Sequence, residues 1–144
     1  MKKKILIIPV VIIIISIFVI SQPDSSESKN QKKFHVTLAD PDQYNEGVYS
    51  SKFELDKGGD YSFRFVPNGD SPQILSIKLE GDEFQFSEDF KLNGTLHETG
   101  ISEYYTWDYE GRKVINVPSS QEIFIQINPN GNVMGSVSVD IIEN

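Results

Sequence analysis

The segment Gly59-Asp-Tyr-Ser-Phe-Arg-Phe-Val-Pro-Asn-Gly69 shows most clearly how this chain folds. Its aromatic residues Tyr61, Phe63 and Phe65 are separated by single polar residues. Successive side chains of a β-strand point to opposite faces of a sheet, so this alternation predicts a strand with one buried and one solvated face. Glycine before the run and Pro-Asn-Gly after it are typical turn residues.

The same period of two recurs along the rest of the chain. Apolar and polar residues alternate over 34–38, 49–55, 75–79, 123–127 and 133–141. Turn residues separate these runs at 56–59, 67–69, 80–82, 93–94, 110–111 and 129–131. No helical stripe follows residue 20. The pattern therefore predicts an all-β fold, an antiparallel β-sandwich or jelly roll of about eight or nine strands, whose order cannot be read from the sequence.

The N-terminus has a different character. Three lysines at positions 2–4 precede the run 5–20, which is apolar except for Pro9 and Ser16. We expect residues 1–21 to form one hydrophobic helix, either a retained single-pass membrane anchor or a signal peptide cleaved near Ser21. As a helix the run spans ~24 Å, slightly less than a ~30 Å hydrocarbon core. The lysines predict a cytoplasmic N-terminus with the rest of the chain outside.

Residues 22–33 contain no apolar side chain except Pro23 and are expected to form a flexible polar stalk, followed by an extracytoplasmic domain at 34–144. Removing the three N-terminal lysines from thirteen basic residues leaves ten, against twenty-one acidic ones, a formal charge of −11. Such a surface repels nucleic acid, which we exclude as a partner. The chain has no cysteine, which excludes disulfides and thiolate chemistry.

The segment Gly59–Asn68 resembles the lumenal β-sandwich (GOLD-type domain) of the emp24/gp25L/p24 family, in which a Gly-x-aromatic-x-Phe-Cys-Phe strand occurs. It is also similar to small membrane-anchored archaeal proteins that carry such a domain. Arg64 stands where the family has its disulfide cysteine. The family's coiled coil, C-terminal membrane helix and sorting tail have no counterpart in this pattern. The resemblance thus implies the fold and a binding role, and does not imply vesicle transport.

Oxygen donors are concentrated in the segment 40–46, which offers Asp40, Asp42, Asn45 and Glu46. Clustered carboxylates and amides on a loop suit Ca²⁺, so these four residues are candidate metal ligands. The spacing lacks the glycine and terminal glutamate of an EF-hand. A loop stiffened by Pro41 is the alternative, and no cofactor is otherwise expected.

Aromatic residues are concentrated in the segment 101–109. In a strand, Tyr105, Trp107 and Tyr109 would share one face, which we expect to pack on the core. Tyr104 and Asp108 would lie on the opposite, exposed face and are the candidate ligand-binding residues. Aromatic side chains beside acids can stack on sugars or anchor a protein partner.

Other motifs carry less information. His35 and His97 are the only imidazoles and make a poor metal site. Asn93-Gly-Thr95 is a candidate glycosylation sequon, expected in a turn. No nucleophile elbow, phosphate loop or dinucleotide fingerprint occurs, so we do not expect an enzyme.

These observations favour a membrane-tethered extracytoplasmic interaction module that binds an envelope protein or a glycan. The membrane contact is expected at residues 5–20. An architectural subunit of the cell envelope that assembles through strand edges is the alternative, and a small hydrolase is a more remote one.

Overall fold

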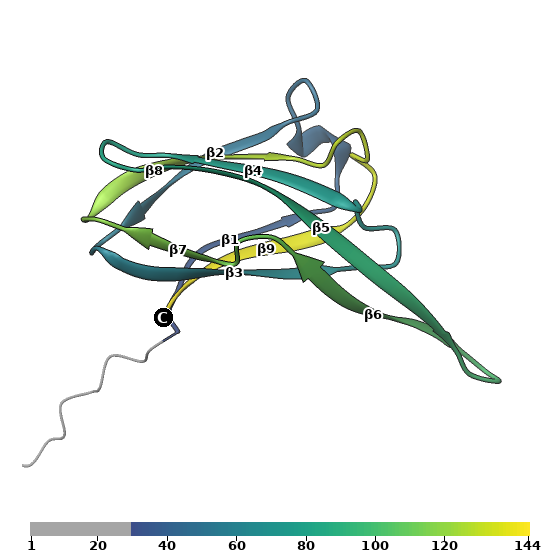
Figure 1. Cartoon of the computed structure of the whole chain (residues 1–144). Coiled ribbons are helices and arrows are strands. Elements are labelled where there is room, and N and C mark those ends of the chain that lie inside the picture. Colours follow the sequence, from purple (N-terminus) through teal and green to yellow (C-terminus); the bar gives the residue numbers. More distant parts are fainter. Residues whose placement is uncertain (1–29) are drawn as a thin grey trace, which may run out of the picture.

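The computed structural model describes residues 30–144, which form two antiparallel β-sheets packed face to face (Figure 1). The expected N-terminal helix and residues 22–29 of the expected stalk lie outside this range, whereas the last two expected stalk residues, Lys32 and Lys33, already belong to the first strand. The strands are β1 (Lys32–Leu38), β2 (Tyr49–Leu55), β3 (Gly59–Pro67), β4 (Ile74–Glu80), β5 (Gln85–Glu98), β6 (Glu103–Glu110), β7 (Val114–Val117), β8 (Gln121–Asn128) and β9 (Val137–Glu143).

One sheet has the strand order β1-β9-β3-β7 and the other β2-β8-β4-β5-β6. The predicted all-β sandwich is therefore confirmed for the described residues, which contain a short 3-10 helix at Pro41–Gln43 and no α-helix. Within residues 30–144 no helix is long and apolar enough to cross a membrane.

The core lies between the sheets and is built from the apolar side of each alternating run. Tyr61, Phe63 and Phe65 of β3 are all buried, as their parity predicts. The Phe63 ring lies 5.1 Å from that of Phe90, and Phe65 lies 4.9 Å from the same ring. Burying side chains of this size contributes roughly 1.5–3 kcal/mol each, so this aromatic cluster is a principal source of the sandwich's stability.

The last strand begins later than the sequence pattern indicated. Val133 was expected to continue the alternation of 137–141 but lies in the loop before β9. The Asn132 side chain accepts a hydrogen bond from the Gly135 amide and donates one to the Asp70 carbonyl. These local bonds hold the chain in a turn, and strand pairing with β3 begins at Val137.

The expected turn at Asn93–Gly94 is wrong, because β5 continues through both residues. Gly94 lies opposite Trp107 on β6, and a Cβ atom at this position would lie only 2.9 Å from the indole ring. The glycine thus gives space for a cross-strand indole rather than marking a corner. The actual hairpin turn follows Glu98, where the Thr99 amide donates to the Ser102 carbonyl at 2.7 Å.

The hairpin of β5 and β6 extends beyond the sandwich. β4 pairs with β5 only as far as Lys91, whereas β6 follows β5 out to the pair Glu98–Glu103. Residues 93–108, which we call the arm, therefore form a two-stranded ribbon that projects from one end of the domain (Figure 1). The start of the described chain and the C-terminus lie together at the other end (Figure 1).

Candidate functional site: the projecting arm

The inner face of the arm continues the core side of the sheet into solvent. Leu92 and Tyr109 pack on the core, and so does Trp107 in the next pair outward, Gly94–Trp107, which is followed by Leu96–Tyr105. This order follows from the pleat, since residues two apart in a strand face the same way. An apolar surface therefore passes without interruption from buried core to exposed ribbon.

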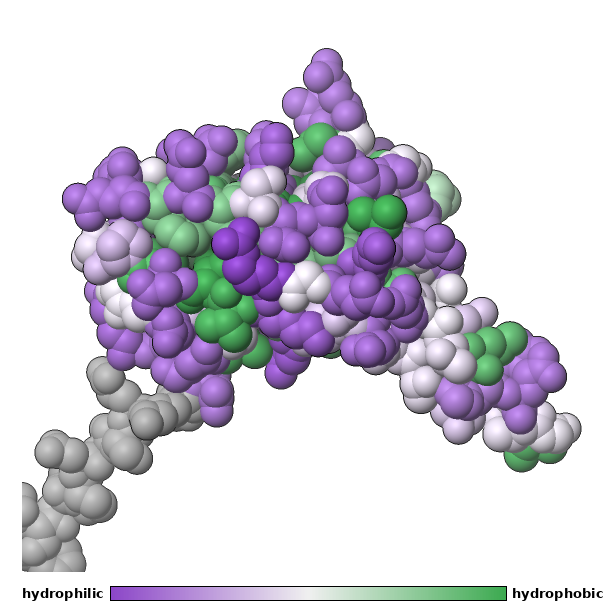
Figure 2. Space-filling view, in the orientation of Figure 1, coloured by the Kyte–Doolittle hydropathy of each residue, from purple (hydrophilic) through white to green (hydrophobic). Residues whose placement is uncertain are grey.

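Side chains on this inner face become more exposed toward the tip. Trp107 is half-buried, whereas Tyr105 is 43% and Leu96 42% exposed. Ile101 in the hairpin turn is 99% exposed. Figure 2 shows hydrophobic surface on the protruding arm and at its tip. We call Leu96, Ile101, Tyr105 and Trp107 the aromatic strip.

Packing holds the aromatic strip in a defined arrangement. The rings of Tyr105 and Trp107 are stacked with their centroids 5.8 Å apart. A Cβ atom on Gly69, in the loop between β3 and β4, would lie 2.9 Å from the Tyr105 ring, so this ring rests directly on the loop. The arm is thus supported at its base by the body of the sandwich and free beyond it.

The outer face of the arm is more polar. His97 stacks on Tyr104 with ring centroids 5.0 Å apart, and its Nε2 atom lies 2.7 Å from the Thr106 hydroxyl. Tyr104 is 51% exposed, and Asp108, two places further along the same face of β6, is exposed as well. The structure thus places the two candidate ligand-binding residues on one exposed face, opposite Tyr105 and Trp107, as predicted from parity.

Tyr105, Trp107 and Tyr109 were all expected to pack on the core, and this is correct for only two of them. Trp107 and Tyr109 pack against the core, but Tyr105 lies beyond the sandwich and is exposed. The reason is the length of the hairpin, which carries Tyr105 past the end of the opposing sheet. Sequence reasoning therefore missed the inner aromatic strip as a surface.

The arm carries charge of one sign. Residues 93–108 include Glu98, Glu103 and Asp108 and no lysine or arginine. At the base, Glu110 accepts a hydrogen bond from the Asn93 side chain at 3.1 Å. A surface that combines exposed aromatic rings with unopposed carboxylates attracts cationic partners.

Asn93, the candidate glycosylation residue, lies within β5 rather than in the expected turn. It is exposed on the outer face of the sheet, paired with Asp108. A glycan there would project from the face opposite the aromatic strip.

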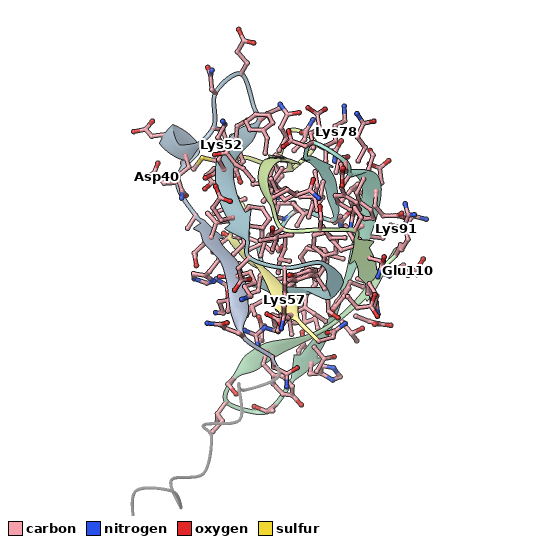
Figure 3. The ribbon with its side chains drawn as sticks, turned by 90° about the vertical axis from the view of Figure 1, so that its left-hand side faces the viewer. Asp40, Lys52, Lys57, Lys78, Lys91 and Glu110 are labelled. Atoms are coloured by element: carbon pink, nitrogen blue, oxygen red, sulfur yellow. The ribbon has the colours of Figure 1, made fainter. Side chains whose placement is uncertain are left out.

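The three carboxylates among the candidate calcium ligands do not form a metal-binding group, while Asn45 and Glu46 line one shallow hollow. Within residues 30–144 no group of three or more acidic or histidine side chains is placed to hold a metal ion, so Asp40, Asp42 and Glu46 do not form one. The Asp40 carboxylate instead accepts a hydrogen bond from the Asp42 amide and caps the 3-10 helix. In Figure 3, Asp40 lies on the opposite side of the domain from Glu110 at the base of the arm.

A buried carboxylate on the outer face of the four-stranded sheet was not anticipated. Asp140 on β9 lies between His35 on β1 and Arg64 on β3, directly opposite each in the strand register. It accepts hydrogen bonds from the His35 Nδ1 and from two nitrogens of Arg64, and Lys32 lies 3.2 Å away. Burial alone would raise the pKa of Asp140, but these hydrogen bonds outweigh burial and hold its pKa below the ordinary value.

A shallow polar hollow adjoins the arm. It has a volume of about 440 Å³ and lies between the turns at Pro67-Asn-Gly69 and Pro129-Asn-Gly131. Its lining includes Asp70, Gln73, Asn130 and Asn132, together with Gly69, on which Tyr105 rests. The hollow thus offers amides and a carboxylate beside an exposed aromatic ring.

Comparison with models of known protein families, with curated proteins and with solved structures finds no match to this chain. The resemblance to GOLD-type domains therefore stays a prediction from the segment Gly59–Asn68.

Proposed function

We propose that this protein is a non-enzymatic interaction module, tethered to the cell membrane with its sandwich outside the cytoplasm, and that it docks a partner protein through the arm. The observation that carries the proposal is the aromatic strip. Tyr105 and Leu96 are each more than 40% exposed, and neither belongs to the hydrophobic core. Contiguous exposed apolar side chains with a polar surround are characteristic of docking surfaces.

The position of the arm also favours docking. The described chain begins and ends at one end of the sandwich, and the arm projects from the other end (Figure 1). If residues 1–21 anchor the chain and the polar residues between them and β1 are a stalk, the tether holds the domain by the end remote from the aromatic strip. The aromatic strip then lies at the end of the domain away from the point of attachment, where a neighbouring protein can reach it.

The distribution of shifted pKa values supports binding rather than catalysis. A hydrogen bond with Asp56 raises the pKa of Lys33, and hydrogen bonds from Lys57 and Lys33 lower that of Glu143. Lys33 and Glu143 belong to ion pairs with Asp56 and Lys57 of the loop between β2 and β3, and Asp140 belongs to the cluster on the outer face of the four-stranded sheet. None of these groups lines the polar hollow. Catalytic groups with shifted pKa values normally converge in a cleft.

A glycan is the second candidate ligand, and the polar hollow is the observation that favours it. Pyranose rings pack their C–H faces on aromatic rings and use their hydroxyls with amide and carboxylate groups. Tyr105 beside Asp70, Gln73 and Asn130 offers that combination. A glycan array probed with the full chain tests this candidate, and binding that survives Tyr105→Ala would exclude it.

Capture from solubilised membranes tests the leading proposal. The full chain serves as bait beside a variant with Leu96→Ser and Tyr105→Ser, which removes two exposed apolar side chains from the inner face of the arm. The matched control is Val114→Ser with Met134→Ser, since these residues are 49% and 69% exposed elsewhere on the domain. We expect one partner protein to be retained by the wild type and the control and lost from the arm variant. Equal retention by the arm variant would refute docking through the arm.

A further inference from the structure

The strand β6 forms one edge of the five-stranded sheet. It is the last strand in the order β2-β8-β4-β5-β6, and no described strand other than β5 pairs with it. An edge strand presents unpaired amides and carbonyls to which another chain can add.

Two hydrogen bonds show which backbone groups of β6 point toward β5 and which point to the free edge. The Leu92 amide donates away from β6, to the Gln73 carbonyl, and the Tyr109 amide donates to the side chain of its neighbour Asp108. Leu92 and Tyr109 are register partners, so theirs is a non-hydrogen-bonded pair. Because antiparallel pairs alternate, the backbone amides and carbonyls of Tyr105 and Trp107 point to the free edge.

Asp108 closes the inner end of this edge by satisfying the Tyr109 amide. The outer part, residues 103–107, remains open over about 17 Å, which matches an incoming strand of about five or six residues. Residues of such a strand that pair with Tyr105 and Trp107 would share their inner face and extend the aromatic strip. Those between them would lie on the outer face, beside Tyr104 and Asp108.

Charge decides what kind of strand fits. β6 has three carboxylates, on Glu103, Asp108 and Glu110, and no basic residue. Addition of a second copy would set two such strands about 4.8 Å apart, where like charges repel. A cationic strand would instead find carboxylates along the edge and aromatic rings beside it.

We propose that the β6 edge binds an extended segment of a partner protein in which lysine or arginine alternates with apolar residues. This inference rests on the proposed function and adds to it the conformation and charge of the docked segment. The apolar residues donate and accept backbone hydrogen bonds at Tyr105 and Trp107, and the basic residues lie beside Asp108.

A synthetic peptide, KVKIKVK, is the probe, titrated against the purified full chain in detergent micelles. Trp107 is the only tryptophan of the chain, so its fluorescence reports binding at the arm. We expect saturable binding, and at least about tenfold weaker binding for EVEIEVE, since every 1.4 kcal/mol is a factor of ten. N-methylation of the valine and isoleucine amides should weaken binding at least about tenfold, because those amides face β6. N-methylation of the central lysine amides, which face away, should change it less than about threefold.

Two substitutions of Tyr105 distinguish the contribution of its backbone amide to peptide binding from that of its aromatic ring. Tyr105→Val and Tyr105→Pro both remove the aromatic ring, but only proline removes the outward amide, a substitution that edge strands tolerate. We expect Tyr105→Pro to bind KVKIKVK at least about tenfold more weakly than Tyr105→Val. Asp108→Lys should weaken KVKIKVK and strengthen EVEIEVE. Circular dichroism and the Trp107 emission of each variant confirm that the domain is folded.

Several results would overturn the proposal. One is that KVKIKVK does not bind, and another is that KVKIKVK and EVEIEVE bind equally. Equal binding of the peptides methylated at the apolar and at the lysine amides, or equal binding of KVKIKVK by Tyr105→Val and Tyr105→Pro, would also overturn it. If the protein self-associates and Tyr105→Pro abolishes this, the strand that adds to the β6 edge is a second copy of this chain and not a cationic segment of a partner. If the Leu96→Ser and Tyr105→Ser variant loses its captured partner while Tyr105→Pro and Tyr105→Val capture it equally, edge pairing fails and docking through the arm stands. If capture survives the serine substitutions, the proposed function itself fails.

Discussion

Replacing Asp140 by asparagine tests how the four-stranded sheet is held together on its outer face. The side chain keeps its size but loses its charge, so packing is preserved while the central carboxylate of the cluster is removed. Asp140 is 2% exposed, and its partners Arg64 and His35 are 50% and 49% exposed. The cluster joins three neighbouring strands, because His35 is on β1 and Arg64 on β3.

The expected cost follows from the bonds. Asp140 Oδ2 accepts from Arg64 Nε at 2.9 Å and from Nη2 at 2.5 Å, and Oδ1 lies 2.5 Å from His35 Nδ1. A hydrogen bond to a charged group contributes roughly 1.5–3 kcal/mol, and solvent around the half-exposed partners favours the lower end. An amide retains part of this, so we expect Asp140→Asn to lose about 2 kcal/mol of unfolding free energy. For a domain of this size the unfolding midpoint falls by about 6–10 °C.

Thermal unfolding followed by circular dichroism measures the change. The control is Glu122→Gln, because Glu122 and Lys52 form an ion pair at 2.6 Å in which both side chains are more than half exposed. We expect the control to leave the midpoint nearly unchanged. An unchanged midpoint in Asp140→Asn would refute the stabilising role of the cluster.

The pH dependence gives a second test of the same cluster. The pKa of Asp140 is lowered in the folded protein. Its contribution to stability is therefore complete above the unfolded pKa of about 3.9 and is lost as the pH falls through the lower folded value. The difference between wild type and Asp140→Asn should be full near pH 6 and shrink below about pH 4. A difference that stays constant into this acidic range would contradict the assignment.

Other predictions concern the arm, the metal and the N-terminus. Gly94→Ala places a Cβ atom 2.9 Å from the Trp107 ring, so the indole should move and its emission shift to the red, whereas Gly100→Ala meets nothing within 4 Å and should leave the spectrum unchanged. Adding and then chelating Ca²⁺ should leave the unfolding midpoint constant; a rise on addition would reveal a native-state site. Mass spectrometry of the mature chain should find the N-terminus intact, as a retained anchor requires; a chain beginning after Ser21 would show a cleaved signal peptide.

The strands could be predicted because burial follows parity in each run. Tyr61, Phe63 and Phe65 face the core as their alternation indicated, and the turn at 56–59 separates β2 from β3. Parity also assigned Tyr104 and Asp108 to one face. These are local properties, fixed by the pleat of a single strand.

The sequence pattern could not show which strands become neighbours. Parity placed Asp140 on the outer face, but its burial depends on β1 and β3 lying on either side of β9. Those pairings join residues 105 and 76 positions apart, and no local signal encodes them. The ion cluster was therefore invisible in the sequence.

The arm was missed for a different reason. Asn93-Gly94 has turn chemistry when read alone, yet Gly94 accommodates Trp107 across the strand pair. The choice between turn and strand was thus decided by a side chain thirteen residues away. A signal was present, because Gly94 and Trp107 lie at equal distances from the turn at Thr99–Ser102, as cross-strand partners in a long hairpin do. This signal can be used only when the register of the hairpin is known.

Site-specific photo-cross-linking in intact cells tests docking through the arm most directly. A photoreactive amino acid replaces Ile101 at the tip or Leu96 on the inner face, and replaces Glu122, which is exposed on β8, as the control. We expect both arm positions to give one discrete cross-linked product of the same partner and Glu122 to give none. Absence of product from the arm, or the same product from all three positions, would contradict the proposal that the arm is where this protein meets its partner.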